Sequence, residues 1–196
     1  MKNKISGYRA RAILLTLLFG SFSFTSAYGF STGNNGNCSG CHAGTGDVTI
    51  EITGPTEVAI DSTHSYVLTL SGGPGVVGGL NVFAATGTFT ATDTDTEVRL
   101  DEIVNTASRD FEQVPVRGTT VPTVSWTFDW TAPGVIGAVD LMAFGLSANG
   151  DGLAFQGIDV TAFTTLTVQV IPIPAALLLF SSGLAVLGWA RRRPST

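Results

Sequence analysis

The chain has 196 residues, a formal net charge of −5 and a hydrophobic content of 44%. Seven of its ten basic residues lie within residues 1–11 and 191–196, so residues 30–170 carry three arginines against fifteen acidic residues, a net charge of −12. This distribution excludes nucleic acid and anionic lipid as partners of the central region, because both require basic patches, and it favours metal cations or a basic protein.

Residues 1–29 predict a secretory signal peptide. Lys2, Lys4, Arg9 and Arg11 form a positive start, and an apolar stretch covers residues 12–24. Small residues follow, as signal peptidases require, and cleavage after Ala27 and cleavage after Gly29 both remain open. The mature chain is therefore expected outside the cytoplasm.

Residues 30–46 form a Gly/Asn-rich segment that contains both cysteines of the chain, in Cys38-Ser39-Gly40-Cys41-His42. C-x-x-C-H is the attachment signature of c-type haem. Cys38 and Cys41 are predicted to form thioethers to the haem vinyl groups, and His42 is predicted to be the proximal ligand of the iron. The cofactor predicted for this chain is therefore covalent haem c.

A C-x-x-C pair can also bind zinc or form a disulfide. A structural zinc site needs four nitrogen or sulfur ligands, and beyond this motif the chain offers only His64. No thioredoxin-like βαβ unit surrounds the motif, which weighs against a catalytic disulfide. A simple disulfide between Cys38 and Cys41 remains an open alternative.

The sixth position on the iron would decide between electron transfer and small-ligand chemistry. Met142 and His64 are the candidate ligands of the mature chain, although Met142 also suits a core position and His64 an ordinary surface position. Residues 31–46 contain few apolar side chains, so the haem must find its apolar contacts on the folded domain. We therefore expect an exposed centre of low reduction potential.

Residues 47–170 predict one all-β domain, a two-sheet β-sandwich of about seven strands. The expected strands alternate apolar and polar residues, with turns between them. Trp126, Phe128 and Trp130 share one face of a strand, which is typical of a core. The expected strands are Val48–Ile52, Tyr66–Leu70, Leu80–Ala84, Glu97–Leu100, Val124–Trp130, Ala138–Leu146 and Thr165–Val170.

Residues 171–196 predict a C-terminal membrane helix with a basic end. Residues 171–190 are uncharged and long enough to cross a bilayer, and three arginines follow at 191–193. With Pro172, Pro174, Ala175 and Ala176 before a Leu-Phe-x-Ser-Gly-Leu run (residues 179–184), this tail resembles the PEP-CTERM sorting signals of Gram-negative bacteria.

The PEP-CTERM resemblance implies recognition by an exosortase-type sorting enzyme and localisation to the outer envelope or cell surface. The usual glutamate between the two prolines is Ile173 here. A permanent C-terminal membrane anchor therefore remains the alternative to cleavage. Both alternatives place the domain outside the inner membrane.

The central region also resembles a known family. The motif at residues 38–42, the segment Trp126-x-Phe128-x-Trp130-Thr131-Ala132-Pro133 and the turn at residues 148–152 are similar to the bacterial choice-of-anchor V domain. That resemblance covers about residues 31–170 and implies a reeler-like β-sandwich displayed at the surface. It implies no specific activity.

These features together predict an exported mono-haem module that passes single electrons to or from an unknown extracytoplasmic redox partner, after maturation by haem-attachment machinery. No catalytic motif indicates an enzyme. The alternative is a non-enzymatic surface or matrix protein with a disulfide at the cysteine pair. The acidic turns near Asp93 and Asn149 lack the spacing of an EF-hand calcium loop.

Overall fold

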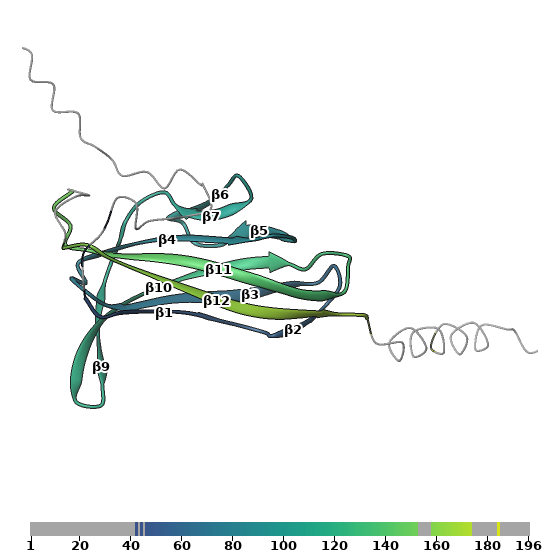
Figure 1. Cartoon of the computed structure of the whole chain (residues 1–196), viewed down its shortest axis with the longest axis horizontal. Coiled ribbons are helices and arrows are strands. Elements are labelled where there is room, and N and C mark those ends of the chain that lie inside the picture. The colour runs from purple at the N-terminus through teal and green to yellow at the C-terminus, as the bar shows by residue number, and fades with distance from the viewer. Residues whose placement is uncertain (1–41, 43, 45, 153–157, 174–183, 185–196) are drawn as a thin grey trace, which may run out of the picture.

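The computed structural model describes residues 42, 44, 46–152, 158–173 and 184, and within them twelve strands form two sheets packed face to face (Figure 1). The all-β sandwich predicted from the sequence is confirmed, with more strands than the seven expected. The strands are β1 (Val48–Thr53), β2 (Glu57–Ala59), β3 (Thr63–Gly72), β4 (Val77–Ala84), β5 (Thr88–Ala91), β6 (Thr96–Arg99), β7 (Glu102–Asn105), β8 (Arg109–Asp110), β9 (Glu112–Val116), β10 (Thr119–Thr131), β11 (Gly137–Ala148) and β12 (Val160–Ile171).

The first sheet has the strand order β1-β3-β10-β5, and β9 pairs with β10. The second sheet has the order β2-β12-β11-β4-β7-β6, and β8 pairs with β4. β2 and β12 pair in parallel, and the other pairs are antiparallel. The β9–β10 hairpin extends away from one end of the sandwich (Figure 1).

The core lies between the two sheets and is rich in aromatic side chains. Trp126, Phe128 and Trp130 of β10 are at most 1% exposed, which confirms the core face predicted for this strand. They pack with Tyr66 of β3 and with aliphatic side chains of β4, β11 and β12. Burial of this apolar surface is the main force that holds the two sheets together.

Tyr66 makes the stability of this core sensitive to alkaline pH. Its hydroxyl is buried and donates a hydrogen bond to the carbonyl of Pro55 at 3.1 Å. Burial raises the pKa of Tyr66 to about 12, against 10.0 for a free tyrosine. The unfolded chain therefore loses this proton at a lower pH than the folded chain, and stability falls as pH rises from about 10 to about 12.

We expect the free energy of unfolding to drop by about 2–3 kcal/mol across that pH range because of Tyr66, at about 1.4 kcal/mol per pKa unit. Urea denaturation followed by tryptophan fluorescence at a series of alkaline pH values would measure the drop. The Tyr66→Phe variant is the control, and its stability should be nearly flat over the same interval. An equal drop in both proteins would contradict this assignment.

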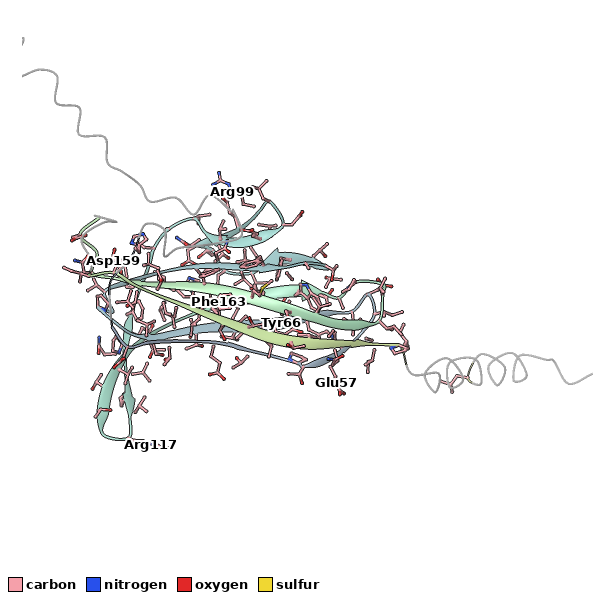
Figure 2. All side chains as sticks on the ribbon, in the orientation of Figure 1. Glu57, Tyr66, Arg99, Arg117, Asp159 and Phe163 are labelled. Atoms are coloured by element: carbon pink, nitrogen blue, oxygen red, sulfur yellow. The ribbon has the colours of Figure 1, made fainter. Side chains whose placement is uncertain are left out.

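The outward side of β4, β11 and β12 carries a row of aromatic rings. Phe144 lies between Phe83 and Phe163, with ring centroids 6.2 and 4.8 Å away. Phe163 is 52% exposed and lies in the first half of β12 (Figure 2). Met142 alternates with the fully buried Leu141 and Ala143, so it lies on this outward side and is half-buried rather than part of the central core.

The predictions for the two ends of the chain lie largely outside the described residues. The structure describes none of residues 1–29, and of residues 174–196 it describes only Leu184. Among the described residues, no helix has both the length and the apolar character to span a membrane. The signal peptide and the sorting tail therefore stay predictions.

Candidate functional site

His42, the last residue of the C-x-x-C-H motif, is bound to the start of β12. Its Nδ1 lies 2.9 Å from Oδ2 of Asp159, a residue 117 positions later in the chain. The His42 side chain is 19% exposed and that of Asp159 is 8% exposed. Cys38 and Cys41 lie outside the described residues, so the two predicted thioether positions stay predictions.

The Asp159 carboxylate is itself held by the backbone. Its Oδ1 accepts a hydrogen bond from the N–H of Asn149 at 3.1 Å, just beyond the end of β11. The carbonyl of Asp159 accepts a second bond from the N–H of Gly44 at 2.8 Å. Asp159, directly before β12, thus connects His42, Gly44 and the end of β11 in one cluster. Figure 2 shows Asp159 at one end of the sandwich.

This arrangement decides which ring nitrogen of His42 is available. An ionised carboxylate can only accept hydrogen bonds, so Nδ1 carries the proton that points to Asp159. In neutral imidazole the lone pair then lies on Nε2, and within the described part of the chain no group hydrogen-bonds this atom. A histidine that ligates a metal through one nitrogen and donates from the other to a carboxylate is a common arrangement in metalloproteins.

An open hollow lies on the domain surface next to this cluster. It is lined by Gly46, Asp47, Gly73, Pro74, Ile158 and Val160. Ile158 and Val160 flank Asp159 in the chain, and Ile158 is 52% exposed. Val160 is only 5% exposed, so Ile158 is the apolar side chain that this hollow offers next to Asp159. The His42 imidazole and its carboxylate partner fit a metal bound through Nε2.

The two residues predicted as sixth ligands lie far from His42. Met142 precedes the last residue of β11, Ala148, by six residues, roughly 20 Å along the strand. His64 is near the start of β3, and its Nε2 is 3.0 Å from the hydroxyl of Ser62. The opposite end of β3, at Gly72, is the end that contacts Ser147 near the His42 cluster. The structure therefore does not bring these side chains together with His42.

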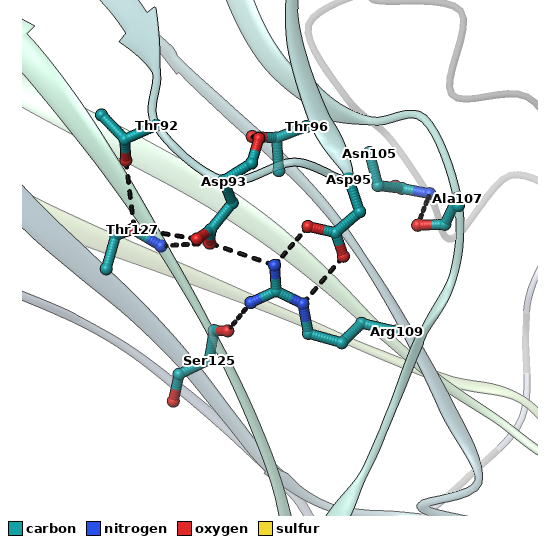
Figure 3. A network of polar contacts seen from close by, with 9 residues as sticks. All are labelled: Thr92, Asp93, Asp95, Thr96, Asn105, Ala107, Arg109, Ser125 and Thr127. Atoms are coloured by element: carbon teal, nitrogen blue, oxygen red, sulfur yellow. Dashed lines mark hydrogen bonds and ion pairs between the residues drawn. The ribbon is translucent and has the colours of Figure 1, made fainter.

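The acidic residues before β6 serve a structural purpose. Asp95 and Asp93 both bind the guanidinium of Arg109, with Nε of Arg109 donating to Asp95 at 2.8 Å and its Nη2 lying 3.2 Å from Asp93 (Figure 3). Burial lowers the pKa of Arg109, but the hydrogen bonds and negative charges of Asp95 and Asp93 outweigh this effect and raise it overall. Arg109 also lies 5.5 Å from the ring centroid of Trp126.

In the second acidic turn, Asn149 and Asp151 hydrogen-bond to each other. The Asn149 amide donates to Asp151 at 2.9 Å, and the backbone N–H of Asp151 donates back to Asn149 at 3.1 Å. Among the residues that the structure describes, no group of three or more His, Cys, Asp or Glu is placed to bind a metal ion.

Comparison with known proteins reveals distant structural likeness alone. No family model matches the chain, and no curated protein matches its sequence. The CARDB domain of a protein from Pyrococcus furiosus aligns at 17% identity and a TM-score of 0.36, covering 69% of this chain and 97% of that domain. The PKD domain of an M14-like peptidase from a Thermoplasmatales archaeon aligns at 13% identity and a TM-score of 0.32, covering 66% and 100%.

Asp159 is the site residue that the sequence analysis missed. It stands in Gly157-Ile158-Asp159-Val160, which is typical of the start of an ordinary strand, and one acidic residue among fifteen has no distinguishing pattern. The only signal in the sequence was its position directly before the last apolar strand of the domain. Its role depends on a contact between the two ends of the domain sequence.

Proposed function

We propose that this protein is an exported mono-haem c-type module that transfers single electrons to or from an extracytoplasmic partner. Cys38 and Cys41 hold the haem covalently, and Nε2 of His42 binds its iron. The bound haem supplies one-electron oxidation and reduction of the iron. The observation that supports this proposal best is the hydrogen bond from His42 to Asp159, which leaves Nε2 as the free ring nitrogen of a C-x-x-C-H histidine.

Each segment of the chain has a function in the proposed electron transfer. The haem-attachment machinery joins the two cysteines to the haem after export through the signal peptide. The domain supplies an exposed apolar contact at Ile158, and the open hollow beside it would keep the haem edge accessible to a partner. The C-terminal segment carries the module to the envelope or cell surface, either as a membrane anchor or as the substrate of an exosortase-type enzyme.

The nature of the redox partner follows from charge. Residues 30–170 contain fifteen acidic and three basic residues, so the module has a strongly negative surface. Long-range attraction speeds the encounter with a partner of opposite charge and weakens as salt rises. We therefore propose a partner with a basic docking surface, and no catalytic turnover by this chain itself.

The mass of the denatured protein tests the proposal directly. The full chain is exported from a host that matures c-type cytochromes, and its mass is compared with that of the same chain from a host without this machinery. Thioether-linked haem adds about 616 Da and gives a reduced absorption band near 550 nm. A colourless product that is about 2 Da lighter than the reduced chain would instead show a disulfide, and would support the surface-binding alternative.

A further inference from the structure

The contact between His42 and Asp159 suggests a role for a residue far from the haem motif. Asp159 is the residue that the described structure pairs with His42, and its other carboxylate oxygen is engaged by the N–H of Asn149. Both carboxylate oxygens are bonded, so the carboxylate cannot turn away from the imidazole without breaking its hydrogen bonds to His42 and Asn149. A backbone hydrogen bond from Gly44 to the Asp159 carbonyl also fixes the main chain at this residue.

The buried position of the Asp159 carboxylate strengthens the effect of its negative charge on His42. Its side chain is 8% exposed, so solvent screens its charge less than that of a surface aspartate. Among the ion pairs of the described residues, Arg99 and Arg109 pair with acidic groups other than Asp159. Within the part of the chain that the structure describes, no arginine forms an ion pair with Asp159.

We propose that Asp159 is a positioning residue that holds His42 in its Nδ1–H form and lowers the reduction potential of the haem iron. The proposal rests on the function proposed above. Hydrogen bonding to a carboxylate increases the electron-donating power of the ligating nitrogen. A nearby negative charge also stabilises the oxidised iron, which carries one more positive charge than the reduced iron, so both effects favour oxidation.

The test compares Asp159→Asn, Asp159→Ala and a control, Asp140→Asn, each as the full chain matured with haem. Asp140 lies on β11 and accepts a hydrogen bond from Thr167 of β12 at 2.6 Å in an exposed position, so its variant removes one charge without touching His42. Redox titration followed by absorption spectra measures the ratio of reduced to oxidised protein. Thermal melting confirms that each variant is folded.

At the wild-type midpoint potential, Asp159→Asn should raise the ratio of reduced to oxidised protein at least tenfold, equivalent to an upward shift of about 59 mV. Asp140→Asn should change the ratio less than twofold. Asp159→Ala should also alter the EPR g values of the oxidised iron, because the ring loses its fixed orientation. A haem-loaded Asp159→Asn variant that titrates like Asp140→Asn would overturn this inference while leaving the proposed function intact.

A second readout does not need haem. In the colourless chain, ¹⁵N NMR of His42 should show the Nδ1–H tautomer, and Asp159→Ala should convert it to a mixture of tautomers. An unchanged spectrum in the variant would refute the positioning role. A wild-type chain that never acquires haem in a competent host would refute the proposed function, and with it the effect on potential.

Discussion

Replacement of both Cys38 and Cys41 by alanine is expected to abolish covalent haem completely, because the two thioether bonds have no other cysteine donor in the chain. The denatured variant should lack haem stain and about 616 Da of mass, both of which the wild type is expected to show. The fold should survive, since the buried core among the described residues contains no cysteine. Circular dichroism of the exported variant checks this point.

A matched control uses the other histidine. His64 lies at the far end of β3 with its ring bonded to Ser62, so His64→Ala should keep full haem content and an unchanged absorption spectrum. Spectral loss in His64→Ala would show that His64 binds the iron in a different conformation of the protein. Full haem staining of the double cysteine variant would refute the attachment model.

The second large effect is expected at Gly87, which has a left-handed backbone with φ of 87°. A Cβ atom there would overlap Nε1 of Trp130 and lie 2.7 Å from the carbonyl oxygen of Thr131. That tryptophan nitrogen donates a hydrogen bond to the carbonyl of Thr86 at 3.3 Å and is part of the core, so it has little room to move. Gly87→Ala therefore combines backbone strain with a steric clash.

We expect Gly87→Ala to lower the free energy of unfolding by about 2–4 kcal/mol, adding about 1 kcal/mol of backbone strain to an overpacking cost of about 1–3 kcal/mol. Gly118 is the matched control, because it also has φ of 87° but no atom lies within 4 Å of the place that a Cβ would take there. Gly118→Ala should cost only the backbone part, about 1 kcal/mol. Urea denaturation measures both, and equal losses would show that crowding at Gly87 is unimportant.

The sequence predicts the long strands well because each of them buries one face. Alternation locates the centres of β3, β10 and β11, where inward residues such as Leu68, Trp126 and Leu141 are fully or almost fully buried. The ends of these strands extend further than predicted, since pairing with a neighbour continues after the apolar pattern stops. β3 ends at Gly72, and Gly72, Gly73 and Gly75 all have positive φ where the chain turns towards β4.

The short strands could not be predicted in the same way. β2, β8 and β9 have two to five residues, and β9 is exposed along its whole length. Such segments contain no hydrophobic alternation to detect, because they are strands only through hydrogen bonds to a longer partner. β2 pairs in parallel with the end of β12, more than one hundred residues later, a contact that no local pattern encodes.

The candidate site likewise has one part that the sequence predicts and another that only the tertiary structure reveals. The sequence by itself predicts the local chemistry, because C-x-x-C-H places two thiols and an imidazole within five consecutive residues, and this spacing is the attachment signature of c-type haem. Only the tertiary structure decided that Asp159 hydrogen-bonds His42 and that Asp93 and Asp95 bind Arg109. It also decided that Met142 and His64 lie apart from the motif. These outcomes depend on which strand ends meet when the two sheets pack, and packing is a property of the whole chain.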